Sequence, residues 1–216
     1  MSVLTGDEKH TAAATSTLDV LWVLYDRVLR IDPARPDDPE RDRFLLSKGH
    51  GPMAYWAVLA AFGFFPRSWL QGWASFDSPL GQHPDRMLVP GVEISSGSLG
   101  HGLPLAVGQA LGLRARGNPA RVVVLVGDAE LDEGSNAEAA ALAGALGLSA
   151  LTTIVIDNHS RSYDGPGTLV APFQAAGWQE RQVNGHDHAQ LAEALERPSS
   201  GPVLVHAETA AKGGLT

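Results

Sequence analysis

The feature that most constrains the fold is a run of five consecutive apolar residues, Val122 to Val126, four of which are valine. A continuous run of this kind is typical of a parallel strand that is covered on both faces. A second apolar run follows at 151–156, and the alanine-rich stretch 135–146 between the two runs predicts a helix. A strand, a helix and a strand in this order predict a parallel sheet.

The rest of the chain extends this alternation. Apolar residues at helical spacing predict a helix over 17–31, which Asp32-Pro33 closes. We expect an α/β fold, a three-layer α/β/α arrangement with a mostly parallel sheet, formed by residues 1–216 as a single domain. The further expected elements are strands at 44–46 and 203–205, helices at 53–62, about 102–116 and 188–195, and an irregular stretch at 66–93.

Composition excludes several classes of protein. The chain has 24 acidic and 16 basic residues, a balance that argues against a nucleic-acid binder. With no cysteine it has no disulfide framework, no cysteine-ligated zinc and no thiol nucleophile. The N-terminus does not resemble a signal peptide, and the longest apolar run, 54–65, is too short to cross a bilayer. We therefore expect a soluble, cytoplasmic protein that binds neither nucleic acid nor a membrane.

Polar side chains follow two of the expected strands. Asp128 comes just after the first and Asn158 just after the second, and ligands of parallel sheets bind beyond such strand ends. A right-handed crossover can place the two ends side by side, so that both oxygens share one Mg²⁺ together with phosphate oxygens. The helix from about Ser135 would offer its positive N-terminal end to an anion. The spacing thus predicts a magnesium–diphosphate site, although Asp128 as a simple helix cap stays an alternative.

The same residues resemble a known family. Residues 127–134, Gly-Asp-Ala-Glu-Leu-Asp-Glu-Gly, followed by Ile156-Asp157-Asn158, look like the thiamine-diphosphate signature of transketolases, which is Gly-Asp-Gly with a later asparagine. Segments 41–51, 82–84 and 97–102 are similar to three further motifs, in the same order as in that family. With 187–195 and 212–214 also following the pattern, the resemblance covers essentially the whole chain.

The resemblance implies thiamine diphosphate and Mg²⁺ as cofactors. Asp128 would coordinate the metal, and the backbone at Ala129 would hold a diphosphate oxygen. Asn158 or His159 would supply the second side-chain ligand, and a carbonyl near Arg161 the third protein ligand.

The resemblance also assigns residues to the organic part of the cofactor and to the substrate. Gly97 and Leu99 would line the aminopyrimidine ring. His50 would lie near the diphosphate and thiazolium, and His83 would face the substrate hydroxyls. Glu133 matches an acidic residue that the family places near the interface between subunits.

Three departures from the family pattern bear on this assignment. Ala129 stands where the family has glycine, and alanine fits only if its φ is negative. Without a gap the usual ligand position falls on His159, but imidazole suits softer metals, so we favour Asn158 with a slight loop shift. His10 keeps the histidine of a substrate-reaching His-Pro-Gly-Gly segment without its proline and glycines. A solvated surface position for His10 is an equal alternative.

By this resemblance the chain is the N-terminal, diphosphate-binding subunit of a split transketolase-like enzyme. It would carry out two-carbon ketol transfer between a ketose and an aldehyde only with a separate C-terminal, pyrimidine-domain subunit, in an α2β2 assembly. One alternative is a subunit of an acyloin-forming or 2-oxo-acid-cleaving thiamine enzyme, so that the small-molecule substrate is a sugar or a 2-oxo acid. Another is a non-catalytic scaffold that has lost the cofactor.

Overall fold

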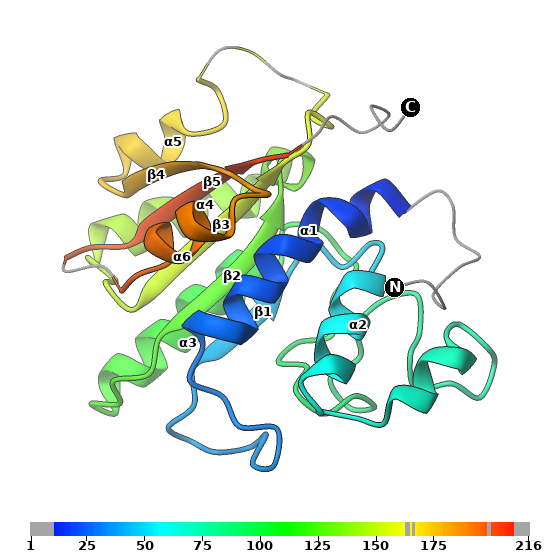
Figure 1. The fold of residues 1–216 in the computed structure, drawn as a ribbon. Coiled ribbons are helices and arrows are strands. Elements are labelled where there is room, and N and C mark those ends of the chain that lie inside the picture. Colours follow the sequence, from blue (N-terminus) through cyan, green and yellow to red (C-terminus); the bar gives the residue numbers. More distant parts are fainter. Residues whose placement is uncertain (1–10, 163–164, 166, 198–199, 210–216) are drawn as a thin grey trace.

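The fold is built on five parallel strands in the order β1-β2-β3-β5-β4 (Figure 1). The computed structural model describes residues 11–162, 165, 167–197 and 200–209. In the sheet register, Val124 of β2 lies between Leu45 of β1 and Thr153 of β3. The strands are β1 (Arg43–Leu46), β2 (Val122–Gly127), β3 (Leu151–Asp157), β4 (Gln179–Asn184) and β5 (Val203–Glu208).

Helices cover both faces of the sheet, which confirms the expected three-layer α/β/α architecture. One layer contains α1 (Thr11–Val23), a π-helical continuation η2 (Leu24–Val28), α2 (Met53–Ala61), η3 (Arg67–Gly72) and α6 (His188–Ala194). The other layer contains α3 (Gly102–Ala115), α4 (Gly134–Ala145) and α5 (Ala171–Ala175). A short 3-10 helix, η4 (Ala129–Asp132), follows β2 directly.

Side-chain alternation along the strands divides the core into two halves. Phe44 and Leu46 point into the layer of α1 and α2, whereas Leu45 between them packs against the layer of α3 and α4. The same division holds for Val123 and Val124 of β2. Because both faces are covered, every residue of β2 is buried, as its continuous apolar run predicts.

The sequence-based prediction missed β4 and α5. Strand β4 reads Gln-Glu-Arg-Gln-Val-Asn and buries only Val183, because it lies at the edge of the sheet. The first helix begins earlier than predicted and ends at Val28, before Leu29 turns to an extended conformation. None of the helices in the described part of the chain has the length and apolar character that a membrane crossing requires.

Candidate functional site

The carboxyl ends of β1, β2 and β3 lie side by side, so the loops that follow them meet at one edge of the sheet (Figure 1). Hydrogen bonds between these loops show how closely they approach. The amide of Gly102, the first residue of α3, donates to Ser47 Oγ after β1 at 3.0 Å. The loop after β3 reaches the end of β2 through Ser160 and Asp128. This edge therefore gathers most of the predicted site residues.

Asp128 lies just after β2 and is almost fully buried, with 1% of its surface exposed. Its Oδ2 accepts a hydrogen bond from Ser160 N at 2.6 Å, and its Oδ1 accepts one from Ser160 Oγ at 2.5 Å. Both donors are uncharged, and no ion pair of Asp128 is found within the described part of the chain. Since each carboxylate oxygen has two lone pairs, Asp128 keeps acceptor capacity for a cation.

Asn158 and His159, the two alternatives for the second ligand, are placed very differently. Asn158 is 3% exposed, and its buried Oδ1 has no hydrogen-bond partner among the described residues. His159 has a φ of 55°, and its half-exposed imidazole Nδ1 lies 3.5 Å from Asp157 Oδ1. The backbone N of His159 donates to the same oxygen at 3.1 Å. The orphaned acceptor thus belongs to Asn158, while His159 is turned toward Asp157.

Ala129 begins η4 and is not among the residues with positive φ, so alanine meets the condition set by the missing glycine. Arg161, on the far side of this loop, does not present its side chain to Asp128. Its Nη2 donates to Asp132 Oδ1 at 2.7 Å and its Nη1 to Thr168 Oγ1 at 3.1 Å. Only its backbone carbonyl is relevant to the predicted ligand set.

His50 and His83 come together although 33 positions separate them: their ring centroids are 4.9 Å apart and their planes are nearly perpendicular. Gly97 packs against His83, and a Cβ at Gly97 would lie 2.6 Å from His83 Cδ2. The φ of Gly97 is 135°, a conformation that favours glycine. The predicted aminopyrimidine loop and both predicted histidines therefore form one group.

The remaining predicted residues lie at the border of this group or outside the described chain. Leu99 is partly buried and Glu133 is exposed. Glu133 touches the loop through its Cβ, since a Cβ at Gly100 would come within 2.6 Å of it. His10 lies outside the described residues, so its predicted position at the substrate stays a prediction.

The sequence-based prediction missed the role of Glu130, which is 1% exposed. Its Oε1 accepts hydrogen bonds from Ser47 Oγ and from Gly100 N, and its Oε2 accepts one from Gly127 N. Burial raises the pKa of the Glu130 carboxyl above its usual value, and these hydrogen bonds together with the charge of Lys48 offset part of that rise. No local sequence pattern signals this role, because two of the three donors, Ser47 and Gly100, lie in loops that are distant in the sequence.

The donor set at this edge suits a hard cation. Asp128 and Asn158 offer oxygen, and Mg²⁺ prefers oxygen ligands that it shares with phosphate and water. The described residues contain no group of three or more His, Cys, Asp or Glu side chains that could hold a metal ion. A cation at Asp128 would therefore take most of its coordination shell from backbone, water and a bound anion.

Comparison with known proteins points to one family. The profile described as "Transketolase, thiamine diphosphate binding domain" matches residues 2–213. An apulose-4-phosphate transketolase subunit of Actinobacillus succinogenes is 38% identical over 216 residues, with 96% of this chain and 78% of the relative covered. The solved transketolase from Leishmania mexicana superposes with a TM-score of 0.76 at 27% identity, over 94% of this chain and 37% of that chain.

A further relative has a name from another class. The "Ferredoxin fas2" of Rhodococcoides fascians is 55% identical over 198 residues, which are 91% of this chain and 65% of that protein. The chain thus spans just under two thirds of the length of that relative. With no cysteine, this chain offers no thiolate to an iron–sulfur cluster.

Proposed function

The chain belongs to the transketolase family through its thiamine diphosphate binding domain, and from this premise we propose that it binds thiamine diphosphate with Mg²⁺ for two-carbon ketol transfer between a ketose and an aldehyde. The observation that carries the proposal is the pair of buried oxygen donors beyond β2 and β3. Among the described residues, the Asp128 carboxylate accepts hydrogen bonds only from the uncharged donors of Ser160, and Asn158 Oδ1 has no donor. A buried polar group without a partner is costly, and a cation would satisfy both at once.

Asp128 and Asn158 are the proposed side-chain ligands of Mg²⁺, with a backbone carbonyl near Arg161 as the third protein ligand. We place His159 outside the coordination shell, because its imidazole faces Asp157 and is a poor ligand for Mg²⁺. The backbone of Ala129, in η4, is proposed to hold a diphosphate oxygen. The N-terminus of α4, which begins at Gly134, adds positive potential at this edge.

When bound, thiamine diphosphate supplies the carbon nucleophile and the electron sink that ketol transfer requires. The residues of this chain would bind it, orient it and move protons around it. Gly97 and Leu99 are proposed to line the aminopyrimidine. His50 and His83 lie within one group of loops, and a neutral imidazole has one ring nitrogen that accepts a proton and one that donates.

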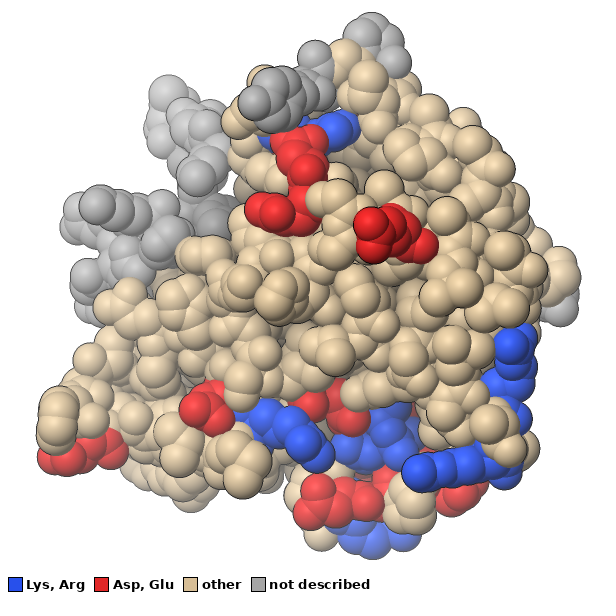
Figure 2. All heavy atoms as spheres, turned by 180° about the vertical axis from the view of Figure 1, so that it is seen from behind, with Lys and Arg blue, Asp and Glu red and all other residues tan. Residues whose placement is uncertain are grey.

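We propose that residues 1–216 form one diphosphate-type domain and that a separate pyrimidine-domain subunit completes the active site, as α2β2. Two relatives are named as subunits of an apulose-4-phosphate transketolase. The layer of α3, α4 and α5 lies behind the sheet in Figure 1, and the middle of that face consists almost wholly of uncharged residues (Figure 2). It exposes Leu105, Leu142 and Leu146, and apolar exposure of this kind supports a protein partner. Glu133 would lie near that interface.

Calorimetric titration of the chain with thiamine diphosphate and Mg²⁺, with and without the partner subunit, tests the proposal. We expect Mg²⁺-dependent binding, and no ketol transfer by the chain alone. A panel of ketose phosphates and 2-oxo acids with the partner present then tests the substrate class. Absence of binding under both conditions would overturn the proposal in favour of a scaffold, and turnover of 2-oxo acids alone would replace ketol transfer.

A further inference from the structure

Glu130 joins the end of the strand that precedes it, β2, to two loops from distant parts of the chain. It accepts hydrogen bonds from Ser47 Oγ after β1, from Gly100 N before α3 at 2.9 Å and from Gly127 N at the end of β2 at 3.2 Å. Ser47 extends the connection, because its Oγ accepts the hydrogen bond from Gly102 N at 3.0 Å. One buried carboxylate thereby holds the start of α3 against the ends of two strands.

The backbone of Glu130 is hydrogen-bonded as well as its side chain. Asn136 Nδ2 donates to the Glu130 carbonyl at 2.6 Å, which fixes η4 to α4. Ser135 Oγ donates to the carbonyl of Gly100 at 2.6 Å, so α4 and the loop before α3 are also joined directly. The backbone that carries the Glu130 carboxylate is therefore itself fixed by a hydrogen bond. The position of the carboxylate in turn restrains Gly100, whose amide donates to it.

The loops that meet at Glu130 are the ones that we propose to recognise opposite ends of the cofactor. Gly97 and Leu99 precede Gly100 in the proposed aminopyrimidine loop, whereas Asp128 and Ala129 follow Gly127 in the proposed diphosphate turn. Glu130 is the side chain that bonds directly to both Gly100 and Gly127. Any ligand that touches both loops depends on the separation that this carboxylate maintains.

We propose that Glu130 is a positioning residue that fixes the aminopyrimidine loop relative to the diphosphate turn, and so matches the site to the length of an intact thiamine diphosphate. This inference rests on the proposed function. It implies a specific pattern of loss: a ligand that reaches both loops should depend on Glu130, and a ligand confined to the diphosphate turn should not. Inorganic pyrophosphate with Mg²⁺ is such a short ligand.

The experiment compares thiamine diphosphate and inorganic pyrophosphate, each with Mg²⁺, by calorimetry on the full chain. The variants are Glu130→Ala, Glu130→Gln and Ser47→Ala, with Glu193→Gln on the exposed surface of α6 as the matched control. For Glu130→Ala we expect about a tenfold loss of affinity for thiamine diphosphate and less than about a threefold change for pyrophosphate, the scale of one or two lost hydrogen bonds. Glu130→Gln should recover part of the loss, since its amide oxygen can still accept from Gly100.

Amide hydrogen exchange gives a readout that needs no ligand. We expect faster exchange at Gly100 and Gly102 in Glu130→Ala, and at Gly102 in Ser47→Ala, with the strands β2 and β3 unchanged. Ser47→Ala keeps the inference testable if Glu130→Ala does not fold, because it removes the bridge to α3 but leaves the carboxylate in place.

The outcomes separate the inference from the proposed function. Wild-type binding of thiamine diphosphate together with unchanged affinity in all three variants would overturn the inference alone. An equal loss for both ligands would also overturn it, because that pattern belongs to general destabilisation. A wild-type chain that binds no thiamine diphosphate with or without its partner would overturn the proposed function and this inference with it.

Discussion

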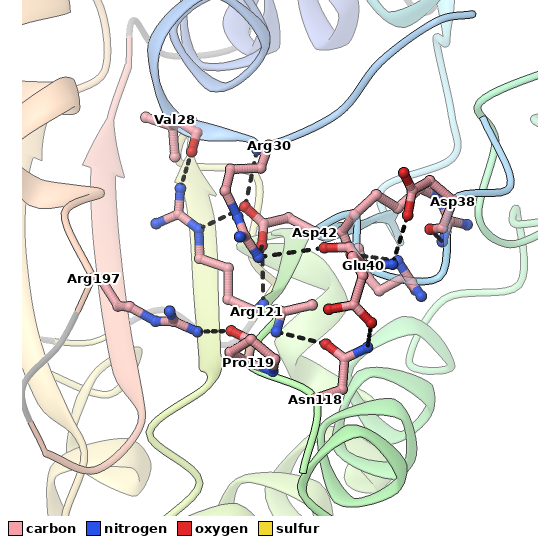
Figure 3. A network of polar contacts seen from close by, with 12 residues as sticks. Val28, Arg30, Asp38, Glu40, Asp42, Asn118, Pro119, Arg121 and Arg197 are labelled. Carbon is pink, nitrogen blue, oxygen red and sulfur yellow. Dashed lines mark hydrogen bonds and ion pairs between the residues drawn. The ribbon is translucent and has the colours of Figure 1, made fainter. Parts of the chain in front are cut away.

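The two ends of the sheet each hold a buried aspartate, and the two carboxylates differ in how far their surroundings satisfy them. Asp42 lies just before β1 and is 3% exposed, whereas Asp128 lies just after β2 and is 1% exposed. Burial alone does not distinguish them. Their hydrogen-bond donors do distinguish them. The donors to Asp42 are backbone amides and the guanidinium of Arg121 (Figure 3), whereas, among the described residues, Ser160 alone donates to Asp128.

At the amino end of the sheet the network around Asp42 is closed. Its carboxylate accepts hydrogen bonds from Arg30 N at 2.9 Å, Arg121 N at 3.0 Å and Arg121 Nε at 3.3 Å. Arg121 in turn donates to the carbonyls of Leu195 and Val28, so it ties the end of α6 and the end of η2 to the sheet. The buried charges of Asp42 and Arg121 compensate each other within the chain. We therefore interpret this ion pair as a structural contact.

At the carboxyl end, the hydrogen-bonding of Asp128 and Asn158 is incomplete among the described residues. Asp128 has neutral donors only, and Asn158 Oδ1, after the neighbouring strand, has none. Such an arrangement sacrifices stability, and proteins keep it where a ligand completes the set. The contrast shows that hydrogen-bond and ion-pair partners, more than burial, distinguish a structural carboxylate from one that is available for binding.

The largest expected effect comes from removing Asp42 from the network at the amino end of the sheet. Asp42→Ala leaves the guanidinium of Arg121 buried without its counter-charge, and we expect a loss of about 3–5 kcal/mol in the free energy of unfolding. Urea denaturation measures it. Asp26→Ala is the matched control, since Asp26 pairs with Arg27 on an exposed surface and should cost less than about 1 kcal/mol. Equal effects of the two substitutions would break the comparison.

The next effect concerns binding instead of stability. Asp128→Asn keeps the size of the side chain but removes the charge, so we expect Mg²⁺-dependent affinity for thiamine diphosphate to fall by at least about 100-fold, or roughly 2.7 kcal/mol. The free energy of unfolding without ligand should change by less than about 1 kcal/mol, because no ion pair is lost among the described residues. Calorimetry and urea denaturation of the same variant check both halves. A variant that binds normally, or unfolds as readily as Asp42→Ala, contradicts the prediction.

A smaller effect decides between the two neighbouring ligand candidates. Asn158→Ala removes the orphaned acceptor, and we expect about a tenfold loss of cofactor affinity with little change in stability. His159→Gly removes the imidazole and suits the positive φ, so affinity should stay within about threefold and stability within about 1 kcal/mol. The reverse order of the two affinities, measured by calorimetry with Mg²⁺, would move the metal to His159.

The position of Asp128 and Asn158 could be predicted from the sequence because it follows from a single rule. Two buried parallel strands that are paired in register bring the residues after their ends together, and Val122–Val126 and 151–156 are recognisable as such strands. The fit of Ala129 was likewise predictable, since alanine needs only a negative φ at that position. The edge strand β4 could not, because its polar sequence lacks the apolar alternation that marks a strand.

The role of Glu130 was beyond reach for a different reason. Its partners Ser47 and Gly100 are 83 and 30 positions away, and nothing local in the sequence distinguishes a buried glutamate from the exposed Glu133 three residues later. The orientation of His159 toward Asp157 also depends on a left-handed turn that Asp157 stabilises. Hydrogen bonds between distant loops depend on the tertiary structure, so local residue patterns do not predict them.

The smallest expected effect concerns Asp19, which contacts the residues that follow β4 at the carboxyl end of the sheet. Like Asp42, it has hydrogen-bond and ion-pair partners within the chain. His186 Nδ1 and His188 Nε2 each lie 2.8 Å from one of its oxygens. Burial acts to raise the pKa of Asp19, but the hydrogen bonds and charges of the two imidazoles outweigh it and hold the pKa below its ordinary value. Asp19 should therefore behave as a structural carboxylate despite its location.

Because the pKa is lower in the folded chain, the contribution of Asp19 is complete above its ordinary pKa and is lost as the pH falls through the lower folded value. Asp19→Asn should reduce the free energy of unfolding near pH 6 by less than about 1 kcal/mol, since the group is a third exposed, and the difference from the wild type should shrink toward pH 3. Urea denaturation across this range measures the trend, and a difference that grows in acid contradicts it. Unchanged binding of thiamine diphosphate by this variant would show that unsatisfied surroundings, and not a place at the carboxyl edge, distinguish Asp128.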